Sequence, residues 1–313
     1  MKPSGWHELL VVAILVFLAA FAPRVLNGYW LSVAVTGMMY VALTTSWAMF
    51  SGPTNYISLA TGAFFGIGAY LVGTGMSDLK QSYWLMTAIA PVVGAVVAAL
   101  IGFATLRLSG VYFVIFTLGL AEMLRNLVSW FQNNIVGSRG LYVLTDLRDH
   151  HLFWMLLAIS ALAYLLGWAI NRSRLGFAVR IIGNDEMVAR HVGINTAAAK
   201  VILYTFTGFF AALVGAVIAP RYSYIEPNQV FSPQLSFLVV IMALLGGSGR
   251  LWGPLVGVIP FTLLWEWASV QFPNQSLLLL GILFLLIVYL LPDGVVGLLQ
   301  KLGHSMREKK NDA

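Results

Sequence analysis

Apolar segments long enough to cross a bilayer follow one another along most of this chain. A helix rises about 1.5 Å per residue, so about 20 apolar residues span the hydrocarbon core. We count about ten such segments, near residues 8–22, 30–50, 56–76, 84–106, 111–131, 152–170, 201–219, 235–248, 253–271 and 276–292. The sequence therefore predicts an all-α polytopic membrane protein whose residues 1–313 form a single transmembrane domain.

Composition and charge exclude several other classes of protein. The chain is 59% hydrophobic and only 10% charged, as membrane proteins are. Its net charge of +6 lies in short loops and in the tail, so it predicts membrane orientation and no nucleic-acid partner. The absence of cysteine excludes disulfides and thiolate metal sites, and we expect no metal and no cofactor in this chain.

A polar stretch at 171–200, which we call the polar segment, interrupts the apolar pattern. Charged residues cost roughly 2.5–3.5 kcal/mol each at the centre of a spanning helix, so this stretch must lie in water. Its cations outnumber its two acids, and they are Arg172, Arg174, Arg180, Arg190 and Lys200 against Asp185 and Glu186. The basic excess predicts the cytoplasmic side.

The polar segment carries the signals of a short capped helix. We expect Asn184 to cap its start, with Asp185 and Glu186 at the positive end of the helix dipole. Arg190 suits the negative end, and Gly193 supplies a left-handed stop. A capped surface helix between two spans is typical of a docking element.

Counting crossings from a cytoplasmic N-terminus predicts the orientation of the chain. Alternation then places Arg107, the polar segment, Arg250 and the C-terminal tail at 300–313 in the cytoplasm. The outer loops carry balanced charges, whereas the inner ones are basic, as the positive-inside rule requires. We therefore expect both termini on the cytoplasmic side.

Two segments are poor spans. Residues 51–70 contain clustered glycines and a proline, and residues 235–254 end in a glycine-rich run after only about a dozen apolar residues. Interrupted helices at membrane depth survive where protein or an aqueous cavity satisfies the freed backbone groups, and they often mark a translocation path. Tight helix packing by small residues is the alternative.

The first of these segments supplies the candidate residues for a path. Asn55, Ser58 and Thr61 could solvate a small polar or zwitterionic substrate, and Phe64 and Phe65 could gate it or contact its apolar part. If the glycines serve packing instead, these side chains are part of the bundle interior.

Glu122 is a further candidate, within the segment 111–131. Arg125 follows one turn later, which is close enough for an ion pair on one helix. Ionisable residues inside a membrane are functional hypotheses by default, although such a pair can also lock helices together.

No catalytic constellation is visible. The chain lacks the phosphate-cradling pattern GxxxxGK[ST], so we do not expect it to hydrolyse ATP by itself. Neither a paired acid and base nor metal-ligand spacing occurs within the spans. We therefore expect a protein that is not an enzyme.

Several motifs in order resemble a known family. The runs SGPTNYISLATGAFFGIGAY at 51–70, LSGVYFVIFTLGLAEMLR at 108–125 and MALLGGSGRLWGPLVG at 242–257, together with the polar segment, are similar to the LivM-type permease subunit of branched-chain amino-acid ABC importers. The resemblance implies a transmembrane permease domain in the bacterial inner membrane. It also implies a LivH-type permease partner, two cytoplasmic ATPase subunits that bind the ATP, and a periplasmic substrate-binding protein.

The resemblance gives the polar segment a role, because it corresponds to the cytoplasmic loop that contacts the ATPase. The residues that we assign to this coupling are Gly176, Arg180, Asn184, Asp185, Glu186, Arg190 and Gly193. A rigid capped helix moves as a body, so it would transmit ATPase closure to the spans.

One departure from the family affects the expected substrate. Members often carry a Gly-His pair where this chain has Ala60 and Thr61. Relatives within the family carry urea, short amides and aromatic acids, so the resemblance implies a branched-chain amino acid or a related small polar molecule as the solute. An ion-coupled secondary transporter is the alternative function, although the spans contain few of the carboxylates that it would need.

Overall fold

The computed structural model describes residues 6–106, 108, 110–137, 140–247, 249–290, 294, 295 and 297. The tail at 300–313, Arg107 and Arg139 lie outside the described residues.

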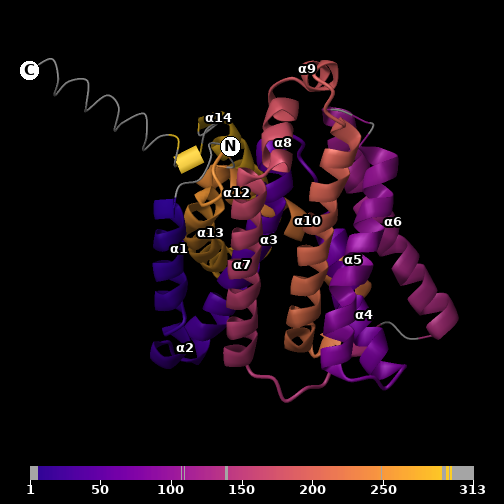
Figure 1. The fold of residues 1–313 in the computed structure, drawn as a ribbon. Coiled ribbons are helices and arrows are strands. Elements are labelled where there is room, and N and C mark those ends of the chain that lie inside the picture. Colours follow the sequence, from indigo (N-terminus) through magenta and orange to yellow (C-terminus); the bar gives the residue numbers. More distant parts are fainter. Residues whose placement is uncertain are drawn as a thin grey trace, which may run out of the picture.

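Helices make up nearly all of the described structure, which confirms the all-α prediction (Figure 1). The helices are α1 (Trp6–Ala19), α2 (Ala22–Val25), α3 (Gly28–Thr54), α4 (Thr61–Ser77), α5 (Tyr83–Thr105), α6 (Val111–Phe131), α7 (Asp149–Arg172), α8 (Arg174–Asn184), α9 (Glu186–His191), α10 (Thr196–Ile218), α11 (Pro227–Val230), α12 (Pro233–Gly246), α13 (Gly253–Gln271) and α14 (Ser276–Leu290). A π-helical turn, η1 (Gln132–Val136), follows α6, and a 3-10 turn, η2 (Ala219–Tyr222), follows α10. Strands β1 (Leu141–Tyr142) and β2 (Tyr224–Ile225) form a two-residue antiparallel pair in which Leu141 faces Ile225.

Eight stretches among the described residues are long and apolar enough to cross a membrane. They run from Glu8 to Val25, from Gly28 to Thr54, from Tyr83 to Thr105, from Val111 to Val136, from Asp149 to Arg172, from Thr196 to Tyr222, from Pro227 to Gly246 and from Gly253 to Gln271. The other two predicted segments form the shorter helices α4, of 17 residues, and α14, of 15 residues. The chain is therefore a multi-pass membrane protein, and the count of ten crossings stays a prediction.

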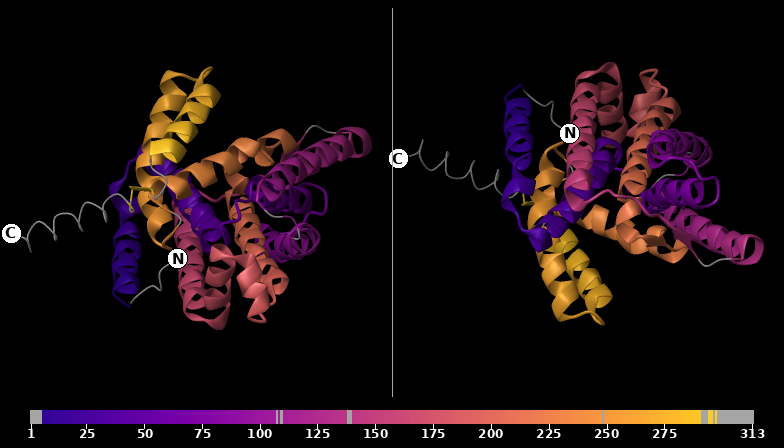
Figure 2. Two further views of the ribbon diagram at one scale, coloured as in Figure 1. Left: turned by 90° about the horizontal axis from the view of Figure 1, so that it is seen from above. Right: turned by 90° about the horizontal axis from the view of Figure 1, so that it is seen from below.

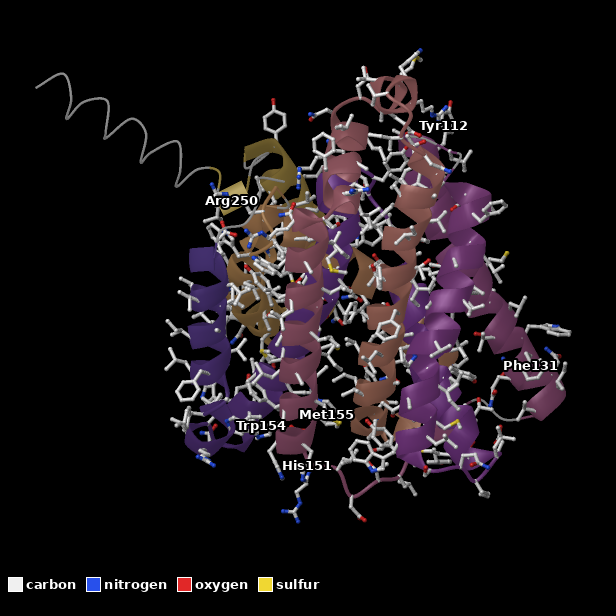
Figure 3. The ribbon with its side chains drawn as sticks, in the orientation of Figure 1. Tyr112, Phe131, His151, Trp154, Met155 and Arg250 are labelled. Atoms are coloured by element: carbon white, nitrogen blue, oxygen red, sulfur yellow. The ribbon has the colours of Figure 1, made fainter. Side chains whose placement is uncertain are left out.

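The ends of the helices agree with the predicted alternation. In Figure 1, α1 begins at the end of the bundle that carries α8 and α9. Arg250 lies toward that same end, whereas His151, in the first turn of α7, lies at the opposite end (Figure 3). Seen along the bundle, α6 and the α13–α14 hairpin project from its edges (Figure 2). Which compartment each end faces stays a prediction.

The best-packed part of the bundle joins α4, α5 and α10, and close backbone approach holds it together. A Cβ added at Gly68 would lie 1.9 Å from the carbonyl oxygen of Ala212, and one added at Gly215 would lie 2.0 Å from that of Phe65. Small residues allow such contacts between spans, where the hydrophobic effect contributes little. The packing interpretation therefore holds for Gly68 in the first glycine-rich segment.

That segment is also broken, as its sequence predicts, but the helix starts later than expected. α3 ends at Thr54, and Asn55 has a left-handed backbone with φ of 58°. Residues 55–60 then run back along α3, because the indole of Trp47 donates to the carbonyl oxygen of Ser58 (2.8 Å). The predicted span 56–76 is thus wrong at its start, since α4 begins at Thr61.

Candidate functional site

The polar segment begins with a tight corner between α7 and α8. The hydroxyl of Ser173 caps α8 by accepting from the backbone N–H of Gly176 (3.4 Å). A Cβ at Gly176 would lie 2.3 Å from the carbonyl oxygen of Ile170, so only glycine fits this corner. Arg180 donates to the carbonyl oxygen of Asn171 (2.8 Å) and to its side-chain oxygen. Gly176 and Arg180 therefore shape the corner from inside.

The far end of α8 rests on the end of α3. A Cβ at Gly183 would lie 2.1 Å from the carbonyl oxygen of Pro53, so the two backbones touch. The side-chain amide of Asn55 donates to the carbonyl oxygen of Gly183 (2.9 Å). Asn55, a predicted path residue, therefore joins the break after α3 to the polar segment.

The short helix α9 exists as predicted, but its capping residue differs. Asn184 is the last residue of α8, and Asp185 caps α9 instead, accepting from the N–H groups of Met187 (2.7 Å) and Val188 (3.1 Å). The assignment of Asn184 as the cap is therefore wrong, because Asp185 has the extended backbone that a cap requires. Gly193 has φ of 83°, which confirms the left-handed stop.

A buried lysine ties α9 to two other elements. The ammonium of Lys200 donates to Glu186 on α9 (3.0 Å), to the hydroxyl of Tyr56 (3.2 Å) and to the carbonyl oxygen of Leu106 after α5 (2.9 Å). Tyr56 also donates to the other carboxylate oxygen of Glu186 (2.6 Å). Lys200 is only 2% exposed. We call Tyr56, Glu186, Lys200 and the Leu106 carbonyl the Lys200 latch.

The electrostatics of the latch favour an ionised Glu186. Partial burial alone would raise its pKa, but hydrogen bonds from Tyr56, Arg190 and Lys200 outweigh that effect and lower the pKa to about 2 from its ordinary 4.5. Arg190 reaches Glu186 from the next turn of α9 (2.8 Å). The latch is therefore intact throughout the neutral and mildly acidic range.

The outer surface of α9 exposes bulky apolar side chains. Met187, Val188 and Val192 are 68%, 51% and 63% exposed, and we call these three residues the apolar tip. Beside them, Glu186 and Ala189 face inward. An apolar surface at the end of a polar helix is typical of a docking site for another protein.

The other predicted path residues gather at the break, inside the bundle. Ser58 and Thr61 are 2% and 1% exposed, and Phe64 and Phe65 are fully buried. Ser58 donates to the hydroxyl of Tyr204 (3.4 Å), whereas the hydroxyl of Thr61 has no hydrogen-bond partner among the described residues.

Aromatic rings fill the space beside the break. The rings of Phe50, Phe64 and Phe113 all pack on Tyr204, with centroids between 5.2 and 6.1 Å away. Tyr56 of the latch packs on Phe113 (5.4 Å). We call Phe50, Phe64, Phe113 and Tyr204 the aromatic plug. It lies between Tyr56 of the latch and Phe64 in the first turn of α4.

Glu122 lies apart from these residues. It pairs with Arg125 on α6 (2.5 Å), as predicted, and the two side chains are 35% and 30% exposed. α6 contacts the bundle through Phe113 of the aromatic plug and through Thr117, whose hydroxyl accepts from the N–H of Leu59 (3.1 Å). Glu122 is therefore separate from the break, which α6 contacts through Thr117.

A family described as "Branched-chain amino acid transport system / permease component" matches residues 29–288 of this chain. The chain belongs to this family. The resemblance that the sequence motifs suggest is thereby confirmed.

Curated relatives of this permease carry names that agree with the family. The LivM permease protein of the Escherichia coli high-affinity branched-chain amino-acid transport system is 26% identical over 93% of this chain and 75% of its own length. The LivH permease protein of the same kind of system in Salmonella typhimurium is 22% identical over 88% and 96%. The ribose import permease RbsC of E. coli is 29% identical over 40% and 37%. No solved structure matches the chain.

The chain is thus a permease subunit of an ABC importer for amino acids or related solutes. Within the part of the permease that the structure describes, no cluster of acidic residues and histidines has the composition of a metal site.

Sequence reasoning missed two features of this permease. Lys200 counts in the sequence only as one of several loop cations, because its partners Tyr56 and Leu106 are 144 and 94 residues away. The apolar tip carried only a weak signal, since Met187, Val188 and Val192 are three of several bulky apolar residues in the polar segment.

Proposed function

We propose that this permease subunit moves a branched-chain amino acid, or a related small polar solute, inward across the bacterial inner membrane. Partner ATPase subunits supply the energy, and a periplasmic binding protein delivers the solute. The family description and the names of the LivM and LivH relatives support the solute class. One structural observation supports the coupling: the Lys200 latch joins α9 directly to the break that precedes α4.

The apolar tip is the proposed ATPase contact. Exposed bulky side chains in an aqueous region are best explained by a partner that covers them. Met187 and Val192 would enter an apolar groove of the ATPase, while Asp185 and Gly193 fix the two ends of α9. Displacement of α9 would then move Glu186, and with it Tyr56 and residues 55–60.

The break before α4 is the proposed path, held closed in this structure by the aromatic plug. The unpartnered, buried hydroxyl of Thr61 and the hydroxyl of Ser58 are the polar groups that a solute would meet there. Withdrawal of Tyr56 by the latch would loosen Phe113, on which its ring packs.

The outward side of α6 is the proposed contact with a second, homologous permease subunit. Glu122 and Arg125 lie in the middle of this span, where charges facing lipid are costly. The Nε atom of Arg125 has no partner within the described residues. A neighbouring permease, or an aqueous path between the two permeases, would supply polar contacts to the exposed third of the two side chains.

The docking proposal is tested by Met187→Asp. Aspartate near the start of a helix is favoured by the helix dipole, so α9 should persist while the apolar contact is lost. We expect at least a tenfold loss of ATPase subunits recovered with the permease. The matched control is Leu144→Asp, an apolar residue that is 75% exposed in the loop between β1 and α7. Equal recovery with both variants would refute the contact.

The path proposal is tested by Thr61→Val, which removes a hydroxyl that has no hydrogen-bond partner among the described residues. Stability should hardly change, so a fall in solute uptake would report contact with the solute. The control is Thr45→Val on α3, whose hydroxyl is likewise buried and unpartnered. Uptake assays in proteoliposomes with the binding protein measure the difference, and normal uptake by Thr61→Val would remove this residue from the path.

The solute itself is tested through the binding protein. We expect the protein that stimulates ATP hydrolysis by the reconstituted complex to bind leucine, isoleucine or valine. Preference for urea, an amide or an aromatic acid would replace the proposed solute and leave the importer assignment in place.

A further inference from the structure

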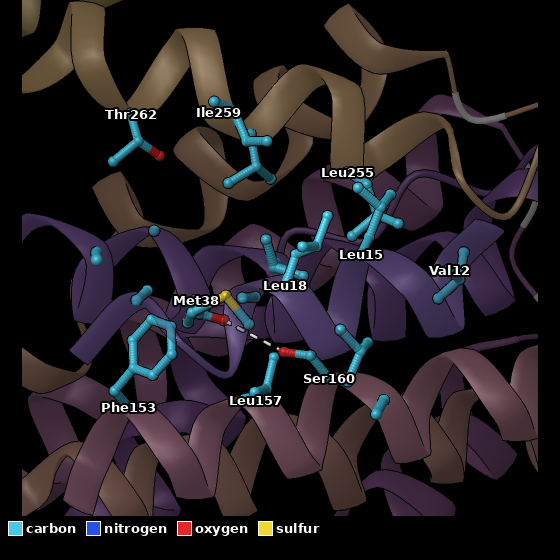
Figure 4. Close-up of a pocket in the computed structure, with 18 of the residues that line it drawn as sticks. Val12, Leu15, Leu18, Met38, Phe153, Leu157, Ser160, Leu255, Ile259 and Thr262 are labelled. Atoms are coloured by element: carbon cyan, nitrogen blue, oxygen red, sulfur yellow. Dashed lines mark hydrogen bonds between the residues drawn. The ribbon is translucent and has the colours of Figure 1, made fainter. Parts of the chain in front are cut away.

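A large cavity lies far from the latch, between α1, α3, α7 and α13 (Figure 4). Its volume is about 460 Å³, which is within the range of about 300–1,000 Å³ that small-molecule pockets occupy. Small residues at the walls, among them Ala34, Gly37 and Ala161, leave this space. A Cβ added at Gly37 would meet only the methyl group of Thr262, at 3.9 Å.

The lining is unsuited to the polar solute. It contains no charged side chain, and its polar side chains are Ser160, Tyr164 and Thr262, of which the last two have hydroxyls with no hydrogen-bond partner among the described residues. The hydroxyl of Ser160 is already engaged with the carbonyl oxygens of Leu156 (2.8 Å) and Met38 (3.5 Å), the latter bond being drawn in Figure 4. A zwitterion would lose its hydration here and would meet no charged group to replace it.

The cavity opens at the perimeter of the bundle. Leu15 and Leu18 on α1 line it and are also 51% and 61% exposed, and Ile259 and Leu263 on α13 line it with 64% and 48% exposure. These four residues border a mouth between two apolar spans. In a membrane that perimeter faces hydrocarbon, so the material at the mouth is lipid.

We propose that this cavity is a lipid site that holds one acyl chain of a bilayer phospholipid, inserted between α1 and α13. An empty void of this size would cost stability in proportion to its volume, and the two unpartnered hydroxyls of Tyr164 and Thr262 are too few to satisfy water throughout about 460 Å³. A flexible hydrocarbon chain fills an apolar space of irregular shape and enters laterally from the bilayer. The lipid would join α1, whose described contacts with the bundle are chiefly with α7, to α13.

The test uses a phosphatidylethanolamine that carries a photoactivatable diazirine in one acyl chain, added to the full-length permease in liposomes. We expect crosslinks at cavity-lining positions on α1 and α13, and one retained phospholipid by native mass spectrometry. Gly37→Leu should fill the cavity and reduce both signals at least fivefold, and the smaller Gly37→Ala should reduce them less. The control is Gly281→Leu on α14, where nothing lies near an added Cβ.

Three outcomes would overturn the site. Crosslinks spread evenly over outward-facing residues, with no response to Gly37→Leu, would mean ordinary annular lipid. Ordered water bound to Tyr164 and Thr262 would mean a hydrated cavity. Crosslinking of a cysteine at Ile259 to a partner chain in the assembled importer would mean that protein covers the mouth. If Gly37→Leu fails to accumulate in membranes, the positions crosslinked in the unaltered permease decide the question: crosslinks confined to the cavity lining on α1 and α13 support the site, and evenly spread crosslinks overturn it.

Discussion

Two acid–base pairs in this permease have opposite environments. Glu186 and Lys200 come from two elements near the end of the spans, and Lys200 is 2% exposed, with three partners. Glu122 and Arg125 lie one turn apart in the middle of α6, about one third exposed, with one atom of Arg125 unpartnered among the described residues. The first pair is completed within the chain, whereas the second is not.

The difference suits the two pairs to different roles: the Glu186–Lys200 pair to coupling within the chain, and the Glu122–Arg125 pair to assembly with another subunit. A buried pair with additional hydrogen bonds fixes the elements that it joins, because losing either partner leaves a desolvated charge. A neighbouring pair on one helix adds only about 0.2–0.5 kcal/mol to that helix. Charges at the centre of a span must therefore gain their main stabilisation elsewhere, and we propose that on α6 they gain it from a second permease subunit.

The largest effect is expected from Lys200→Met, which keeps the length of the side chain and removes the charge. The latch then loses its contacts to Glu186 and the Leu106 carbonyl, at a cost of about 3 kcal/mol, the lower end for breaking a buried pair. We expect a lower unfolding temperature in detergent and solute uptake that falls more than ATPase recovery does.

The matched substitution Arg125→Met should leave the unfolding temperature nearly unchanged. A double-mutant cycle of Lys200→Met with Glu186→Gln isolates the pair itself. Additive effects in that cycle would contradict the latch.

A second effect follows from pH. Because the pKa of Glu186 is lowered from 4.5 to about 2, its contribution to stability is complete above about pH 4.5 and is lost as the pH falls toward 2. The unfolding temperature of the permease should therefore fall faster over this window than that of Glu186→Gln, after each is referred to its own value at pH 7. Parallel curves for the two proteins would contradict the assignment.

A third, smaller effect is expected from Gly193→Val. A β-branched residue at φ of 83° costs about 1–2 kcal/mol locally. The strain should displace the end of α9 and weaken ATPase docking, while membrane insertion stays normal. Gly249→Val in the loop before α13, where an added Cβ meets nothing and φ is not positive, is the control. Undiminished recovery of ATPase with Gly193→Val would show that the stop is dispensable.

The orientation is open to a direct test because the chain has no cysteine. Val192→Cys on the α9 side and Gln81→Cys in the loop between α4 and α5 are both at exposed positions. We expect an impermeant thiol reagent to label only Gln81→Cys in cells with a permeabilised outer membrane. Labelling of Val192→Cys would reverse the orientation and remove α9 from the cytoplasm.

Much of the fold was predictable because span length and charge are local properties. Apolar runs located the helices, and Gly52 and Pro53 predicted the break after α3. The left-handed backbone of Asn55 and the packing of residues 55–60 along α3, where Ser58 accepts from Trp47, depend on tertiary contacts that cannot be read from the sequence. The cap was misplaced by one residue for a related reason. Asn184 and Asp185 are both good capping residues, and the packing of Gly183 on Pro53 decides that α8 continues through Asn184.

The candidate site was less predictable, because its partners are distant in sequence. Ser58, Thr61, Phe64 and Phe65 share one segment and are all buried, whereas Asn55 is exposed and bonds to Gly183 of the polar segment, and their role in a path stays a prediction. The buried contacts of Lys200 could not be predicted from the sequence, since a lysine in the first turns of an apolar helix ordinarily reaches into water. Only the fold brings it beside Tyr56 and the end of α5.

The smallest effect on the chain itself is expected from replacing both members of the α6 pair, Glu122→Gln with Arg125→Gln. The two amides keep hydrogen-bonding groups and leave no unpaired charge, so the free energy of unfolding of the isolated subunit should change by no more than about 0.5 kcal/mol. If the pair faces a second permease subunit, however, the amount of that subunit recovered in the complex should fall severalfold. The same double replacement leaves the Lys200 latch unchanged, so recovery of the ATPase subunits should stay normal. It therefore separates the role of the α6 pair from that of the Glu186–Lys200 pair. Normal recovery of the second permease together with normal solute uptake would mean that Glu122 and Arg125 stabilise only each other, and that α6 meets its partner through another face or not at all.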